Sequence, residues 1–328
     1  MTAPLLRASA VAVAVLSLAA CSWRVETPPP EWPSPGPVTQ MRDAAAEREQ
    51  AVLDATGHGA GAAGATTAQA SVLSEIEAGA TQERLDALGG LYVPYPDQSP
   101  SPSSSGEPRD LIALAMSARD GHLADARVAE DPDLAFLLSS AGLSHALSSW
   151  YAGWVADAIT ESTQPIVAER TIRSDELATD QPAPATTSVD PDVVAELAVM
   201  HDQAGYAYEV LAARSADAER DQWIARRDIH RDRAAALTQL PGVEDRRDAV
   251  YSLPGDGTAG SAARAATAVD LETHAAQTYA GMLDGAAAAD LPWLLNAAFD
   301  AYAQAAAFGE PTAESFAVPA LPGAVPTD

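Results

Sequence analysis

The sequence predicts an all-α protein with two helical domains, on three observations. Apolar residues recur at spacings of three and four along several alanine-rich segments, a periodicity typical of helices that bury one face. Signals for β-strands, such as alternating β-branched residues or Asn-Gly turns between apolar runs, are nearly absent. The chain of 328 residues is also longer than one hydrophobic core usually supports. We therefore expect two helical domains in series.

Residues 1–20 have the layout of a secretory signal peptide. Arg7 precedes an apolar run, residues 8–20, that is too short for a comfortable membrane span of about 20 residues. Small residues end the run directly before Cys21, the only cysteine of the chain. This layout predicts a lipoprotein processing site with lipid on Cys21; the alternative is an uncleaved anchor or a core helix with a chance cysteine. We expect the protein in the cell envelope, on the outer face of the cytoplasmic membrane.

The charge of the chain limits its partners. The formal net charge is −27, so the protein is repelled by nucleic acid and by anionic lipid headgroups. We therefore expect no nucleic-acid partner and expect attachment to the membrane only through the lipid on Cys21. Residues 21–37 are rich in proline, which predicts a semi-rigid extended tether between the lipid and the first domain.

The N-terminal helical domain is expected over residues 38–164, followed by a linker over 165–189 that has no helical periodicity. The pair Gly89-Gly90 ends the second predicted helix, and the aromatic residues Trp150, Tyr151 and Trp154 predict a packing cluster on the fourth. The helices predicted in this domain are Met41–Ala55, Thr67–Leu88, Asp110–Ala126 and Pro132–Ile159.

The second helical domain is expected over residues 190–323. Asp190-Pro191 is a strong helix start, because aspartate is a good N-cap residue and proline suits the first helical position. Residues 133–141 match residues 290–298 at five of nine positions, which raises the hypothesis of two tandem four-helix bundles; a chance likeness of helix starts is the alternative. The predicted helices are 191–215, 218–239, 260–284 and 289–308.

The core stripes of the second domain contain polar side chains near the middle of three predicted helices, and Tyr302 lies on the stripe of the fourth. Antiparallel neighbours of similar length would bring these side chains to one layer of the core. The predicted polar core cluster consists of His201, Arg227, His230, Glu272 and Tyr302. In the first domain His122 and His145 also lie on apolar stripes, and we expect them to be ordinary core residues without a site.

Two interpretations of the predicted cluster compete, and a small-ligand pocket is a third. In one, Glu272 pairs with Arg227 and the histidines bond within the same network, because a buried charge is tolerated only when paired. In the other, His201, His230 and Glu272 bind a metal ion. The Glu-x-x-His pairs of di-metal bundles are missing, and the charge of Arg227 disfavours a cation. We therefore expect no metal and no cofactor.

The same residues resemble a known family. His201 to Leu211, with Tyr206-Ala207-Tyr208 at its centre, is similar to the first helix of a ferritin-like domain family of unknown function found in actinobacterial secreted and lipid-anchored proteins. The run His230-Arg231-Asp232-Arg233 resembles the family's His-Arg-x-Arg signature on the second helix, and Glu272 falls where the third helix has a glutamate. His201 stands where the family has glutamate, and Asp202 where it has histidine.

The resemblance covers residues 190–321 and implies a ferritin-like four-helix fold without ferroxidase activity. We find no nucleophile motif, phosphate-binding loop or paired-cysteine metal motif, so we do not expect an enzyme. The function predicted from sequence is a non-catalytic binding or scaffold module, with an envelope protein or a small ligand as partner. The alternative is a degenerate ferritin-like metal-binding protein for redox chemistry or storage.

Overall fold

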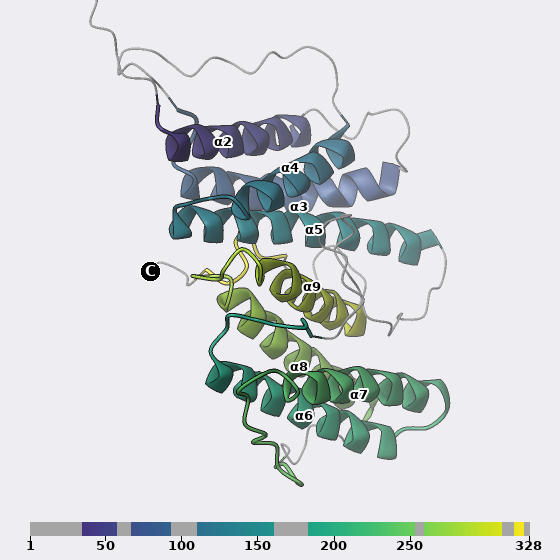
Figure 1. Cartoon of the computed structure of the whole chain (residues 1–328). Coiled ribbons are helices and arrows are strands. Elements are labelled where there is room, and N and C mark those ends of the chain that lie inside the picture. Colours follow the sequence, from purple (N-terminus) through teal and green to yellow (C-terminus); the bar gives the residue numbers. More distant parts are fainter. Residues whose placement is uncertain are drawn as a thin grey trace, which may run out of the picture. The chain divides into compact units, whose positions relative to one another are not determined.

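The computed structural model describes residues 35–57, 67–92, 110–160, 183–252, 259–309 and 318–324, and these residues form helices without strands (Figure 1). The all-α prediction is therefore confirmed, and each predicted helix is present with ends that differ by a few residues. The signal, Cys21 and nearly all of the tether lie outside the described residues. The helices are α2 (Pro37–Thr56), α3 (Thr67–Ala87), α4 (Leu111–Ala126), α5 (Pro132–Thr160), α6 (Pro191–Ala213), α7 (Asp217–Leu237), α8 (Ser261–Gly281) and α9 (Leu291–Phe308).

Helix ends follow the capping residues of the sequence. The carboxylate of Asp110 accepts a hydrogen bond from the backbone N–H of Ile112 at 3.0 Å, and Asp190 accepts one from Asp192 at 2.8 Å. Both are N-caps that satisfy otherwise unpaired N–H groups. After α3, Gly89 and Gly90 adopt φ of +87° and +73°, the left-handed conformation that ends a helix. Among the described helices, none is both long and apolar enough to cross a membrane.

The helices form two groups of four. In the first group α2 packs against α3 and α4, and α5 packs against α3 and α4, so that the four helices surround a common core. In the second group α6 packs against α7, α8 packs against α9, and α6 also contacts α8. The consecutive helices α3 and α4 make only a weak contact with each other. The connection between them is more than twenty residues long.

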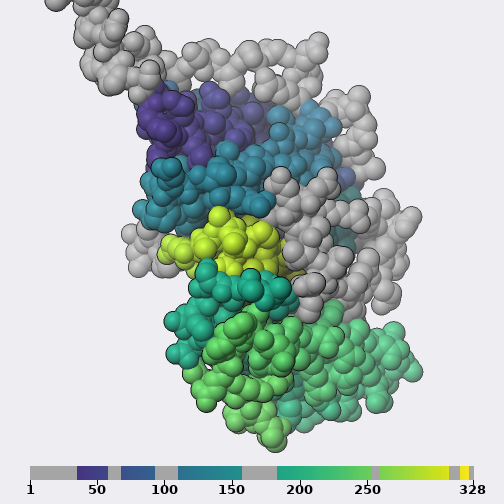
Figure 2. All heavy atoms as spheres, viewed as in Figure 1, coloured from purple at the N-terminus to yellow at the C-terminus, as the bar shows by residue number. Residues whose placement is uncertain are grey.

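The two groups contact each other through α5 and α9 (Figures 1 and 2). The described residues from Pro37 onward form one compact unit, and the largest apolar core among them contains side chains of both groups. The predicted aromatic cluster lies at this contact: the rings of Trp150 and Trp154 stack, and Trp150 meets Phe299 of α9 edge-on with centroids 6.4 Å apart. The helices of the two predicted domains, 38–164 and 190–323, therefore share apolar packing.

The described end of the predicted linker is held by Asp290. Its carboxylate accepts hydrogen bonds from Thr187 Oγ1 at 2.6 Å, from the backbone N–H of Ser188 at 3.1 Å and from Trp293 Nε1 at 3.0 Å. Asp290 occupies the N-cap position of α9 but makes no side-chain cap bond there. The rest of the predicted linker, residues 165–182, lies outside the described residues.

Part of the C-terminal tail packs on the first group. Ser144 Oγ and Ser140 Oγ on α5 donate to the carbonyl oxygens of Pro319 and Pro322, each at 2.7 Å. Gly323 then approaches α8 so closely that an added Cβ would lie 2.2 Å from the carbonyl oxygen of Ala280. Its φ of +88° and this contact both require glycine. The tail therefore connects α5 with α8.

Candidate functional site

Each helix group buries a cluster of charged and polar side chains in its core. All of the residues concerned are 0–1% exposed. The C-terminal cluster consists of His201, Tyr208, Arg226, His230, Arg233, Glu272, Tyr279 and Asp300. The N-terminal cluster consists of Glu49, Glu77, Thr81, Arg84, His122, Ser144 and His145.

Glu272 of α8 is the centre of the C-terminal cluster. Its Oε1 accepts hydrogen bonds from Tyr208 at 2.7 Å, from Arg226 Nε at 2.6 Å and from His230 Nε2 at 3.1 Å. Its Oε2 accepts a further bond from Arg226 at 2.7 Å. Although burial opposes the charge, Arg226 and His230 hold the pKa of Glu272 well below its usual range. Glu272 is therefore a carboxylate whose acceptor positions are filled by protein donors.

Two neutral histidines continue the network from Glu272 across the bundle. A carboxylate can only accept, so His230 donates from Nε2, and its Nδ1 accepts from His201 Nδ1 at 2.8 Å. His201 Nε2 then accepts from the Tyr279 hydroxyl at 2.6 Å. Burial lowers the pKa of His201 well below its usual value and also lowers that of His230. The two imidazoles therefore carry one proton each in this chain of hydrogen bonds.

The remaining charges of the C-terminal cluster compensate one another. Arg226 also donates to Asp300 Oδ2 at 2.9 Å, and Arg233 donates to the same oxygen at 2.7 Å. Two arginines thus face two carboxylates, and the cluster is neutral when both histidines are neutral. A guanidinium already lies between Glu272 and Asp300, where a metal ion bound by both carboxylates would have to lie. Arginine nitrogens thus already bond the carboxylate oxygens that face each other here, which disfavours a cation between them.

The structure brings together three of the five residues predicted for this cluster: His201, His230 and Glu272. Arg227 does not join them; it is partly exposed and pairs with its neighbour Asp228 at 2.7 Å. Tyr302 packs in the apolar core, where burial raises its pKa to about 12. Positions 226 and 227 are four and three residues before His230, and both spacings return to the same side of a helix. The sequence pattern selected the wrong arginine for this reason.

Replacing Arg226 tests its role in the C-terminal cluster. Arg226→Met leaves Glu272 and Asp300 short of one compensating charge, so we expect the free energy of unfolding to fall by about 3–5 kcal/mol. Arg227→Met is the matched control, because Arg227 is on the surface and should change stability by less than about 0.5 kcal/mol. Urea denaturation followed by circular dichroism measures both, and equal losses in the two variants would contradict the assignment.

The buried histidines predict a pH dependence of stability with a definite sign. The unfolded chain takes up a proton on His201 below pH of about 6.5, whereas the folded protein, in which the pKa is lowered, does not. The free energy of unfolding should therefore decrease as the pH falls from 7.5 to 5.5, by up to about 1.4 kcal/mol per pH unit for this group.

The contribution of His201 is isolated by subtracting the stability profile of His201→Gln from that of the wild type. Groups that do not contact His201 titrate alike in both proteins and cancel in the difference. We expect the difference to shrink as the pH is lowered through 6.5, since only the wild type loses stability through this imidazole. A difference that stays constant between pH 7.5 and 5.5 would show that His201 is not held neutral by the fold.

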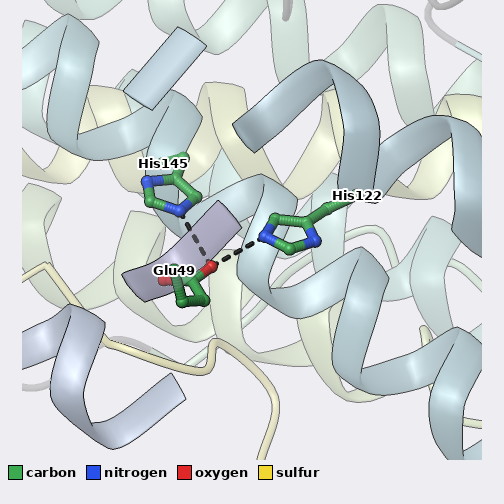
Figure 3. Close-up of side chains that lie close together, drawn as sticks. All are labelled: Glu49, His122 and His145. Carbon is green, nitrogen blue, oxygen red and sulfur yellow. Dashed lines mark hydrogen bonds and ion pairs between the residues drawn. The ribbon is translucent and has the colours of Figure 1, made fainter. Parts of the chain in front are cut away.

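The N-terminal cluster centres on Glu49 of α2 (Figure 3). Its Oε1 accepts from His122 Nε2 of α4 at 2.7 Å and from His145 Nε2 of α5 at 3.0 Å. His145 also uses its other ring nitrogen, which lies 3.1 Å from Glu77 Oε1 of α3. Since both carboxylates only accept, this geometry requires a proton on each nitrogen of His145. His145 is therefore an imidazolium in this arrangement.

Arg84 is the second cation of the N-terminal cluster. It donates to Glu49 Oε2 at 2.9 Å and also pairs with Glu77, and it donates to Ser144 Oγ at 2.8 Å. Because Ser144 donates in turn to the Pro319 carbonyl, Arg84 links this cluster to the C-terminal tail. Burial opposes the charge of Glu77, but His145 and Arg84 lower its pKa to about 2.

The two histidines of the N-terminal cluster differ in charge. Burial opposes protonation of His145, and Arg84 adds repulsion, but the carboxylates of Glu77 and Glu49 outweigh both and raise its pKa. Burial lowers the pKa of His122, which donates to Glu49 from Nε2. The Nδ1 of His122 is buried and has no hydrogen-bond partner within the described part of the chain. One arginine and one imidazolium thus balance two carboxylates.

This cluster was missed by the sequence analysis, which assigned His122 and His145 to the core without a site. The donor atoms of Glu49, His122 and His145 all lie within 4.8 Å of one another, and they form the one potential metal-binding group among the described residues. Charged residues at core spacing could have indicated it: Glu49 lies between the buried residues Ala45 and Val52, and Arg84 follows Glu77 and Thr81 at steps of four and three. A charged residue at core spacing was also the basis for predicting Glu272 in the C-terminal cluster.

Comparison with protein-family models, with curated proteins and with solved structures finds no match to this chain. The ferritin-like resemblance of residues 190–321 therefore stays a prediction from the motifs.

Proposed function

We propose that this chain is a lipid-anchored protein of the cell envelope whose helical part is a non-catalytic binding or scaffold module. One observation carries the non-catalytic part of the proposal: among the described residues, the buried titratable side chains of the two clusters bond mainly to one another inside the helix groups. Glu272 has its acceptor positions filled, and Glu49 is bonded by two histidines and an arginine. A substrate would have to enter a core whose charges are already compensated.

Two hollows on the described surface lie away from the buried clusters. One, of about 600 Å³, is lined by Ala124 near the end of α4, by Arg127 and Val128 after it, and by Ala288 and Ala289 between α8 and α9. Another, of about 300 Å³, lies along α2 and α4. Neither is lined by a member of the two buried clusters. An envelope protein or a small ligand remains the proposed partner, and the net charge of −27 argues against nucleic acid.

We further propose that the second helix group has a ferritin-like arrangement. Its supporting observation is the order of contacts: α6 with α7, α8 with α9, and α6 with α8. The longest connection of this group joins its second and third helices, α7 and α8, as in bundles with one crossover. The first group shares these three pairings, α2 with α3, α4 with α5, and α2 with α4, and adds a contact of α3 with α5; the shared pairings support the hypothesis of two tandem bundles.

The alternative function is a degenerate ferritin-like metal-binding protein. In the second helix group the place between Glu272 and Asp300 is taken by Arg226, so His201, His230 and Glu272 have no free position for a metal ion. Support for metal binding comes instead from the N-terminal cluster, where three donor atoms converge.

Replacing Cys21 tests the anchoring. Cys21→Ser removes the only thiol of the chain, so we expect complete loss of labelling by a radioactive or clickable fatty acid and release from the membrane fraction. Ser22→Ala is the matched control, since it leaves the residues before the cysteine unchanged, and it should remain labelled and membrane-bound.

The folded state should not depend on the lipid, because the helices pack on one another from Pro37 onward. Cys21→Ser protein should therefore keep the helical circular dichroism and the melting temperature of the wild type. If the variant stayed in the membrane fraction, lipid on Cys21 would not be the anchor; if it unfolded, the helical part would not be an independent module.

A further inference from the structure

The N-terminal cluster differs from the C-terminal cluster in how its charge is compensated. The C-terminal cluster has two arginines for two carboxylates, and both cations are permanent. The N-terminal cluster has two carboxylates, Glu49 and Glu77, but a single arginine, Arg84. One negative charge therefore has to be compensated on the side of the histidines, by a proton or by another cation.

We propose that Glu49, His122 and His145 form a binding site for one divalent transition-metal ion, for which Zn²⁺ is the best-fitting probe. The site would be bound by Glu49 Oε1, His122 Nε2 and His145 Nε2. Three different helices, α2, α4 and α5, supply these atoms, and Figure 3 shows the two imidazoles pointing at the same carboxylate oxygen.

The distances suit a metal ion of this size. Glu49 Oε1 lies 2.7 Å from His122 Nε2 and 3.0 Å from His145 Nε2, and all three donor atoms lie within 4.8 Å of one another. Zinc binds imidazole nitrogen and carboxylate oxygen at about 2.0–2.2 Å, so ligand atoms of a tetrahedral site are about 3.3 Å apart. Small side-chain movements are enough to reach this spacing. Two nitrogens and one oxygen are a known zinc donor set that leaves one position open.

The residues around the three donors would orient them for a metal. His145 Nδ1 lies 3.1 Å from Glu77 Oε1, so this carboxylate keeps a proton on Nδ1 and leaves Nε2 free to bind the ion. Arg84 Nε donates to Glu49 Oε2 at 2.9 Å and holds the other oxygen, Oε1, toward the histidines. Carboxylate–histidine–metal arrangements of this kind fix the ring and raise its basicity as a ligand.

Metal binding has a defined proton balance. His145 would lose the Nε2 proton to solvent, and the proton of His122 would move from Nε2 to Nδ1, the ring nitrogen that has no hydrogen-bond partner in the described structure. One proton is therefore released for each Zn²⁺ bound, which calorimetry in buffers of different ionisation enthalpy measures directly. The site gains the divalent charge in place of that single proton, beside two carboxylates.

The test uses the full mature chain in detergent, stripped with chelator and titrated with Zn²⁺ against a chromophoric competitor. We expect one zinc per chain, a higher melting temperature in excess zinc, and an affinity reduced by at least about 100-fold in His122→Gln. His122 is the ligand best replaced, because within the described residues its side chain hydrogen-bonds to Glu49 alone. His201→Gln in the C-terminal cluster and His274→Gln on the surface are matched controls and should bind as the wild type does.

X-ray absorption of the zinc-loaded wild type keeps the proposal testable even if His122→Gln fails to fold. The spectrum should show two imidazoles and oxygen at about 2.0–2.2 Å and no sulfur. Absence of stoichiometric binding, unchanged affinity in folded His122→Gln, or fewer than two imidazoles would overturn the proposal. Cys21 is not a ligand of the proposed zinc site, so Cys21→Ser protein should bind zinc as the wild type does. Failure of the zinc proposal is therefore distinguishable from failure of the anchoring proposal.

Discussion

The structure depends on pairing buried charges inside small helical cores. Arg226 lies between Glu272 and Asp300, and Arg84 lies between Glu49 and Glu77, each arginine on the second helix of its group. An unpaired carboxylate in such a core would cost several kcal/mol, whereas a bonded set of opposite charges is tolerated. Together with the bonds of the buried histidines, these pairs join the four helices of each group and constrain their register, because a shift of one residue would separate donor from acceptor. Compensation of charge therefore constrains the packing as well as the chemistry.

The connection between the two groups rests on different interactions. Apolar side chains of α5 and α9 meet around Trp150 and Phe299, and the tail adds the hydrogen bonds of Ser140 and Ser144 to proline carbonyls. Ser144 also accepts from Arg84, so the tail and the N-terminal cluster share a side chain. A change in the N-terminal cluster would therefore reach the tail through Ser144. Helix α5 therefore contacts the core of the first group, the C-terminal tail and helix α9 of the second group.

Much of the fold could be predicted from the sequence, because helix signals are local. Asp190-Pro191, Gly89-Gly90 and the stripe containing His201 and Tyr208 each act within one or two turns, and the structure has the corresponding helix ends and buried faces. The arginine of the C-terminal cluster could not be selected the same way. Arg226 and Arg227 both lie within a turn of His230, and only the position of α8 and α9 decides which one meets a carboxylate. The N-terminal cluster depends on four helices far apart in sequence, so lone histidines there could not be told from core residues.

The most direct test of charge compensation is the protonation state of the buried imidazoles in the metal-free protein. Long-range ¹H–¹⁵N NMR at pH 6.5 distinguishes imidazolium from each neutral tautomer. Charge compensation requires His145 to be mainly imidazolium, because Glu49 and Glu77 raise its pKa, and His201 and His230 to be neutral, with the proton on Nδ1 and Nε2 respectively. A neutral His145, or a charged His201, would mean that the cores are not balanced in this way.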